Sequence, residues 1–323
     1  MKRMTPLLLA ALFGSGCLLH ATGAQSYPTR PIRFIVPTPP GGGTDTLARI
    51  AGAKASETLG VQLVIDNRGG AGGNIAAKVV ADSTPDGYTL LLGNLANVIS
   101  MSLYPKLDYN LLRDFAAVSE LASVPFILAV STSVPAQSLS ELIALAKAKP
   151  GQLSYASSGN GQPSHLAMEL LKSMAGVDIK HIPYKGAGPA ALDVISGQVQ
   201  MYFFALPAGL PHIRSNKLKG IAVASNTRAA AALEFPTIAE SGLPGFEAMT
   251  WYGVLAPAGT PGDVVRKLHA AFSKAVVAPD VRRRLTDQGF DVIGNTPAEF
   301  RAYIETEIAK WGKIVKVSGA RVD

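Results

Sequence analysis

The chain has 323 residues, of which 48% are hydrophobic and 16% charged, a composition that excludes intrinsic disorder and allows two domains. Its formal net charge is +7, but only 7% of the residues are aromatic and no basic run contains aromatics, which argues against nucleic-acid binding. The single cysteine, Cys17, lies in the apolar N-terminal stretch, so we expect neither disulfides nor cysteine catalysis in the exported protein.

The N-terminus has the pattern of a secretory signal peptide. Two basic residues precede an apolar stretch over residues 7–19, and small residues follow as far as Ala24, so we expect residues 1–24 to be removed. The alternative is a lipoprotein processing site that leaves a lipid on Cys17, but Gly14 stands where a larger aliphatic residue is expected. No later stretch approaches the roughly 20 apolar residues of a membrane span.

From residue 31 onward, short β-branched runs alternate with helical segments, which is typical of an α/β fold with parallel strands. Glycine-rich turns precede both of the first two helices, so we expect these turns to lie at the same edge of one sheet. The pattern predicts strands over residues 32–36, 61–66 and 89–93, and helices over 44–59 and 74–82.

A second α/β unit begins near residue 126. Ser138 and Glu141 form the sequence pattern of a capping box, in which each side chain binds the other residue's backbone amide at the start of a helix. The same alternation then predicts strands over residues 126–131, 153–156, 180–183, 201–205 and 218–224, and helices over 164–175, 189–196 and 210–216.

The C-terminal segment is too short to form a sheet of its own. It contains a predicted strand over residues 250–255, a helix that begins after Thr260, and a long helix with a capping box at Thr296 and Glu299. We therefore expect the chain to cross back and its last helices to cover the first unit. This predicts two lobes with a cleft between them: lobe 1 from residues 25–125 and 249–323, and lobe 2 from residues 126–248.

The first glycine-rich loop, residues 37–45, lies at the carboxyl end of a strand, where ligands bind in open α/β sheets. Gly41 and Gly42 carry no side chains that would keep a ligand from the backbone, and the free amides of the next helix favour a carboxylate. Asp45 is expected as an acid of the first helical turn. A plain tight turn is the alternative, and the loop matches neither the dinucleotide nor the phosphate-loop motif.

Small polar residues form a second loop, residues 157–165, again between a strand and a helix. The hydroxyls of Ser157, Ser158 and Ser164 are suited to bind the ligand from the opposite side of the cleft. A hydrolase that uses Ser157 or Ser158 with His165 is an alternative, but the Gly-x-Ser-x-Gly motif is absent and a structural histidine is favoured. The other histidines show no metal-site spacing, so we expect no metal and no cofactor.

Eight groups of short motifs occur in one order along the predicted mature chain. They are Tyr27-Pro28 with Pro31-Ile32, Val36-Pro37 with Pro40-Gly41-Gly42 and Thr44-Asp45, Gly70-Ala71-Gly72-Gly73-Asn74, Pro85-Asp86-Gly87-Tyr88-Thr89, the 157–166 loop, Pro183-Tyr184-Lys185-Gly186, Leu210-Pro211-His212-Ile213, and Pro236-Thr237 with Gly242-Leu243-Pro244-Gly245. With these motifs the chain resembles the extracytoplasmic substrate-binding proteins of tripartite tricarboxylate transporters, the Bug family.

The resemblance implies a class II periplasmic-binding-protein fold, in which two α/β lobes close on a small organic acid without catalysis. The implied partners are this ligand and integral membrane transporter subunits, and the implied location is the periplasm. Nothing in the sequence demands more than a monomer, and the composition already argues against a nucleic-acid partner. One ligand carboxylate would be held at lobe 1 by Gly41, Gly42, Thr44, Asp45 and Asn74. The other end would meet lobe 2 at Ser157, Ser158, Gly161, Ser164, His165, Lys185 and Gly186, although a lysine such as Lys185 is also typical of plain surface.

One position departs from the family pattern. Where related proteins often carry aspartate after a Met-x-Phe strand, this chain has Phe204 followed by Ala205. We expect Phe204 and Ala205 to face the cleft and to favour an apolar or aromatic acid over one with an amino group. Tight, selective binding of aspartate or glutamate would contradict this hypothesis. A carboxylate sensor that docks on a signalling partner is the alternative to a transport role.

Overall fold

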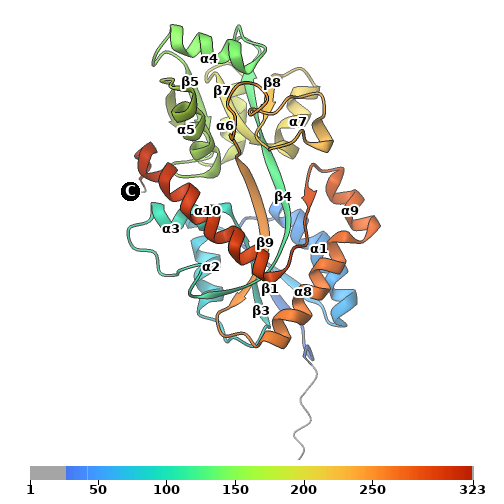
Figure 1. The fold of residues 1–323 in the computed structure, drawn as a ribbon. Helices are drawn as coiled ribbons and strands as arrows, with labels where there is room; N and C mark the ends of the chain where they lie inside the picture. Colours follow the sequence, from blue (N-terminus) through green and yellow to red (C-terminus); the bar gives the residue numbers. More distant parts are fainter. Residues whose placement is uncertain (1–26, 42, 322–323) are drawn as a thin grey trace, which may run out of the picture.

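The computed structural model describes residues 27–41 and 43–321. The predicted signal peptide, Cys17 and Gly42 lie outside the described residues. The described chain forms two α/β lobes, one above the other in Figure 1, that are joined by two long strands. None of the described helices combines the length and the apolar character that a membrane crossing requires.

Lobe 1 is built on three parallel strands with β1 in the middle. Alternate residues of β1 lie in different cores, Phe34 in one and Ile35 in the other, because helices cover both faces of the sheet. Its strands are β1 (Ile32–Val36), β2 (Leu63–Asn67) and β3 (Thr89–Asn94), and its helical elements are α1 (Gly43–Leu59), η1 (Ala71–Gly73), α2 (Asn74–Ala81) and α3 (Leu95–Leu103).

Lobe 2 repeats this arrangement around three parallel strands in the order β7-β5-β6. As in lobe 1, helices follow the carboxyl ends of the strands. The strands are β5 (Ser154–Ser157), β6 (Lys180–Pro183), β7 (Met201–Ala205) and β8 (Leu218–Val223). The helical elements are α4 (Leu139–Ala148), α5 (Pro163–Ala175), α6 (Ala187–Ile195), α7 (Leu206–Arg214) and η2 (Ala230–Ala232).

Strands β4 (Phe115–Ser131) and β9 (Met249–Pro257) connect the lobes. They pair with each other in antiparallel fashion, and β9 also pairs with β3 of lobe 1 whereas the second half of β4 pairs with β7 and β8 of lobe 2. In Figure 1 both strands run from one lobe into the other. The predicted lobe boundaries at residues 126 and 249 fall inside β4 and at the first residue of β9, and this division of the chain stays a prediction.

The C-terminal helices cover more than lobe 1, which corrects the expectation from the sequence. Helix α8 packs on α1, but α10 packs on α3 and β4 and also reaches α5 of lobe 2. Phe300 and Ile304 on α10 are fully buried. The elements of this segment are α8 (Gly262–Val277), α9 (Pro279–Thr286), β10 (Asp291–Val292) and α10 (Pro297–Ser318).

Two local predictions also need correction. The capping box at Thr296 and Glu299 is present, but at α4 the Glu141 carboxylate accepts the amide of Gln137 rather than that of Ser138. Helix α7 begins at Leu206, four residues before the predicted start, because a proline is tolerated in the first helical turn.

Candidate functional site

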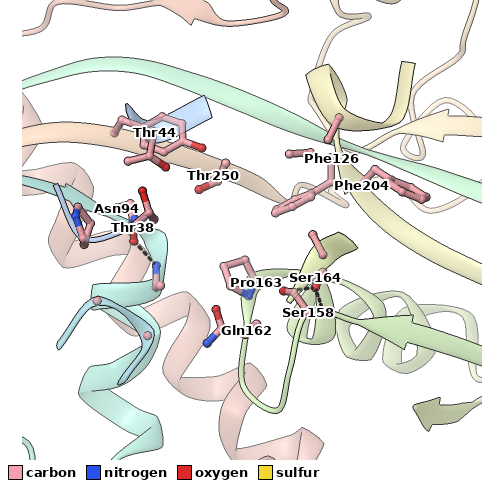
Figure 2. A pocket seen from close by; sticks show the side chains of 18 of the residues that line it. Thr38, Thr44, Asn94, Phe126, Ser158, Gln162, Pro163, Ser164, Phe204 and Thr250 are labelled. Carbon is pink, nitrogen blue, oxygen red and sulfur yellow. Dashed lines mark hydrogen bonds between the residues drawn. The ribbon is translucent and has the colours of Figure 1, made fainter. Parts of the chain in front are cut away.

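A pocket of about 380 Å³ lies between the two lobes (Figure 2). Each lobe, counted with the adjoining strand β4 or β9, supplies one wall. The lobe 1 wall consists of Pro37, Thr38, Thr44, Gly70, Gly72, Gly73, Asn94, Ala96, Thr250 and Tyr252. The lobe 2 wall consists of Phe126, Ser158, Gln162, Pro163, Ser164, Ala187, Tyr202, Phe204, Ala205 and Ala208.

Six helices begin at this pocket, three in each lobe. The lining residues include the starts of α1, α2 and α3 on one side and of α5, α6 and α7 on the other. Amides of a first helical turn have no partner within the helix, and together with the helix dipole they favour an anion. Among the described residues, the lining contains no lysine, arginine, histidine, aspartate or glutamate. An anion here would be held by neutral donors alone.

The glycines between β2 and α2 bring the backbone to the pocket surface. Gly70, Gly72 and Gly73 have φ values of 120°, 66° and 93°, which a residue with a side chain rarely adopts. A Cβ atom on Gly73 would also lie 3.0 Å from Cβ of Pro37 in the neighbouring loop. Glycine is therefore required here by conformation and by close approach, as the sequence pattern indicated.

Each wall carries one tyrosine with two hydroxyl neighbours. The phenol of Tyr252 lies beside the hydroxyls of Thr44 and Thr250, and that of Tyr202 lies beside the hydroxyls of Ser158 and Ser164. Burial raises the pKa of both phenols above the ordinary value, so both stay neutral at physiological pH. A neutral phenol keeps an O–H that can donate to a ligand acceptor.

Thr38 has a buried hydroxyl in the lobe 1 wall. Its carbonyl oxygen accepts a hydrogen bond from Nδ2 of Asn67, but its Oγ1 has no hydrogen-bond partner within the described residues. A buried hydroxyl without a partner loses its hydration energy, and a ligand acceptor in the pocket would restore a bond. Thr38 therefore points to lobe 1 as the place of a ligand acceptor.

Replacing Thr38 by valine should weaken ligand binding about tenfold or more, since a hydrogen bond to a charged group is worth roughly 1.5–3 kcal/mol. The free protein should be as stable as before, or slightly more stable, because the unpartnered hydroxyl is gone. Thr260→Val is the matched control: its hydroxyl bonds the carbonyl of Pro257 away from the pocket. That variant should lose about 1 kcal/mol of stability and keep its affinity in calorimetric titration; equal losses of affinity in both would contradict the assignment.

Five of the predicted site residues line the pocket. They are Thr44, Ser158, Ser164, Phe204 and Ala205. The structure shows them on the walls, and their contact with a ligand stays a prediction.

The other predicted lobe 1 site residues that the structure describes, Gly41, Asp45 and Asn74, do not line this pocket. The carboxylate of Asp45 is buried and accepts from the amide of Gly41 and from the side chains of Arg49 and Asn67, and the Arg49 bond does most to hold its pKa below the usual value. Asn74 accepts from the Tyr109 hydroxyl and borders a separate pocket. Asp45 is therefore held by its own neighbours. Nδ2 of Asn74, however, is buried without a hydrogen-bond partner among the described residues, on the side of the separate pocket.

The lobe 2 residues that miss the pocket also have partners inside the protein. Ser157 is fully buried, with Oγ 2.6 Å from Nε2 of His181. His165 stacks on His181 with ring centroids 3.9 Å apart, and its Nδ1 accepts the amide of Gly161. Burial lowers the pKa of both histidines to about 4, so the rings are neutral. Lys185 and Gly186 also miss the pocket, although the next residue, Ala187, lines it: Lys185 is exposed, and Gly186 donates its amide to the Ser158 carbonyl.

The geometry also opposes the hydrolase alternative. Neither candidate serine bonds His165: Ser157 pairs with a different histidine, and Ser158 Oγ lies 3.1 Å from Ser164 Oγ. Because Ser157 is fully buried, its hydroxyl is not accessible to a substrate.

Gly161 of lobe 2 lies against Leu103 of lobe 1, at a contact between the two lobes. A Cβ atom on Gly161 would lie 2.0 Å from Cδ2 of Leu103 on α3 of lobe 1. A Cβ atom on Gly72 would likewise lie 3.5 Å from Nε2 of Gln162. The two lobes therefore meet beside the pocket in this structure, and the absence of a side chain at Gly161 permits the contact.

Sequence reasoning missed much of the pocket lining. Asn94 ends β3, and its side chain caps α3 in a reciprocal capping box with Asn97. The Asn-x-x-Asn spacing in the sequence could have indicated this helix start. Phe126, Thr250 and Tyr252 belong to the connecting strands, and no local pattern marks a strand residue as facing a cleft.

Comparison with known proteins agrees with this architecture. A family model described as tripartite tricarboxylate transporter family receptor matches residues 47–320. Protein BugT of Bordetella pertussis is 38% identical over 323 residues, which cover 99% of each chain.

Two similar solved structures contain organic acids. That of R. palustris Rpa4515 with adipate has a TM-score of 0.83 at 37% identity and covers 92% of this chain and 100% of that chain. That of MatC (Rpa3494) from Rhodopseudomonas palustris with bound malate has a TM-score of 0.79 at 36% identity and covers 90% of this chain and 100% of that chain. The chain therefore belongs to the tripartite tricarboxylate transporter receptor family, the Bug proteins, which are periplasmic solute-binding proteins rather than enzymes.

Proposed function

We propose that this protein captures a small organic acid, as its carboxylate, in the pocket between the lobes and delivers it to the integral membrane subunits of a tripartite tricarboxylate-type transporter. The observation that carries the proposal is the convergence of six helix starts on one pocket whose described lining has no charged side chain. Such a pocket favours a small anion over a cation or a neutral sugar. The adipate and malate held by the two relatives support a carboxylate.

We further propose that Thr38, Thr44 and Asn94 contact the ligand from lobe 1, and that Ser158, Ser164, Phe204 and Ala205 contact it from lobe 2. Closure would bring these walls together by a hinge in β4 and β9, the strands that join the lobes. The lobe contact at Gly161 and Leu103 fits a closed state of this kind. A closed shape that depends on the ligand is what a membrane partner needs to distinguish loaded from empty receptor.

A thermal-shift screen of the purified protein against mono-, di- and tricarboxylates tests the proposal. A ligand at 100 times its Kd should add about 2.7 kcal/mol to the free energy of unfolding, which appears as a dose-dependent rise of the melting temperature by several degrees. The compound should be recovered unchanged. A panel in which no carboxylate shifts the melting temperature, or one in which the compound is consumed, would contradict the receptor role.

A further inference from the structure

We propose that the ligand carries a single carboxylate, held by lobe 1, and an uncharged apolar body, held by lobe 2 against Phe126 and Phe204. This inference rests on the proposed function and narrows its substrate class. It follows from three differences between the two walls and from one property of the whole lining.

The first difference is in the backbone donors. Each of the three helices that begin on the lobe 2 side has a proline in its first turn: Pro163 in α5, Pro189 in α6 and Pro207 in α7. Proline has no N–H, so each of these helix starts offers one donor fewer to an anion. The first turns of α1, α2 and α3 on the lobe 1 side contain no proline. The backbone therefore favours the carboxylate on lobe 1.

The second difference is in the side-chain hydroxyls. On lobe 2, the hydroxyl oxygens of Ser158 and Ser164 lie 3.1 Å apart, Ser164 Oγ accepts the amide of Ser158, and both hydroxyls lie beside the Tyr202 phenol. These groups satisfy one another without a ligand. On lobe 1, Thr38 Oγ1 is buried and has no partner within the described residues. A donor that still lacks an acceptor again places the carboxylate at lobe 1.

The third difference is the apolar part of lobe 2, which we call the apolar wall and define as Phe126, Phe204, Ala205 and Ala208. Phe204 packs edge-on against Tyr202 with ring centroids 4.4 Å apart, and Phe126 lies opposite Ala205 on the neighbouring strand. In Figure 2 Phe126 and Phe204 lie across the pocket from Thr38, Thr44 and Asn94. A second charged group placed against this wall would lose its hydration without gaining a partner.

The fourth observation concerns amino groups. The described lining contains no aspartate or glutamate, so an ammonium group would find no counter-ion there. Its desolvation would then be uncompensated. The site should therefore discriminate against amino acids that share the carboxylate.

The test is isothermal titration of the purified protein with four acids: phenylacetate and hexanoate as apolar monoacids, adipate as a diacid, and glutamate as an amino diacid. The tighter of the two monoacids should bind at least tenfold better than adipate and at least a hundredfold better than glutamate. Adipate or glutamate binding as tightly as the monoacids would overturn this inference and leave the proposed function standing. Failure of every carboxylate in the thermal-shift screen would instead overturn the proposed function.

Two neighbouring phenylalanines provide a matched pair of variants. Phe204→Leu changes the apolar wall, whereas Phe203→Leu changes a ring that is equally buried but lies on the opposite face of β7, outside the pocket. Phe204→Leu should weaken phenylacetate binding about tenfold relative to Phe203→Leu, while hexanoate changes less. Equal affinities in the two variants would contradict the role of Phe204. Phe126→Leu provides a second test of the wall should Phe204→Leu not fold.

Discussion

Replacing Gly161 by alanine should weaken ligand binding by tenfold to a hundredfold. The new Cβ atom would lie 2.0 Å from Leu103 Cδ2 across the lobe contact, so the closed lobes would have to separate or repack. Overpacking of this kind costs about 1–3 kcal/mol. The φ of Gly161 is also +67°, which adds about 1–2 kcal/mol of backbone strain to the folded state.

Gly176→Ala separates these two effects. Gly176 has a φ of +62° at the end of α5, but a Cβ atom there would meet nothing within 4 Å. It should therefore lose stability by the same backbone strain and keep its affinity. Calorimetric titration of both variants measures the loss of ligand affinity, and thermal unfolding measures the loss of stability. Unchanged affinity in Gly161→Ala would show that the lobe contact is not part of the ligand-bound state.

Replacing Glu120 by glutamine should stabilise the protein by about 4 kcal/mol at pH 8 and by less than about 1 kcal/mol at pH 5. Glu120 lies buried on β4, where its carboxylate accepts from Asn295 Nδ2. Burial, with a smaller contribution from the carboxylate of Glu307, raises its pKa to about 8. The folded protein therefore keeps a proton that the unfolded chain releases above pH 4.5, so stability falls as pH rises from about 4.5 to 8. Each pKa unit corresponds to about 1.4 kcal/mol.

Comparing variant with wild type cancels the titration of other groups, such as the stacked histidines. Urea unfolding at several pH values measures the difference in the free energy of unfolding between the variant and the wild type. Glu305→Gln, on the exposed face of α10, should follow the wild-type pH curve. Parallel curves for Glu120→Gln and wild type would show that Glu120 is ionised in the folded protein.

Much of the fold follows from local pattern, and its exceptions have identifiable causes. Helix α3 was not predicted because Leu95–Leu103 follows β3 without a break and is buried on most sides, so no amphipathic period marks it. Only the second half of β4 was predicted. Its first half contains serines, Glu120 and Pro125, and its pairing with β9 shifts register at two places, so its residues do not alternate regularly. The two-residue β10 is too short to leave a pattern.

The loops that carry the site were predictable, but the side chains that face the pocket were only partly so. Strand ends and helix starts fix where the loops lie, which is why Thr44, Ser158 and Ser164 were found. Asp45, Ser157 and His165 lie on the same loops but bind Arg49, His181 and Gly161, partners that are close only in the folded chain. Sequence spacing contains no information on such pairings.

The most direct test of the central claim, that neutral donors in this pocket hold a carboxylate, compares an acid with its own amide. Isothermal titration should be carried out with the best acid of the screen and with the corresponding carboxamide, which has nearly the same shape and no charge. Because the donors of the six helix starts favour negative charge, the acid should bind at least a hundredfold more tightly. Equal binding of acid and amide would show that the pocket recognises shape rather than charge and would contradict the account.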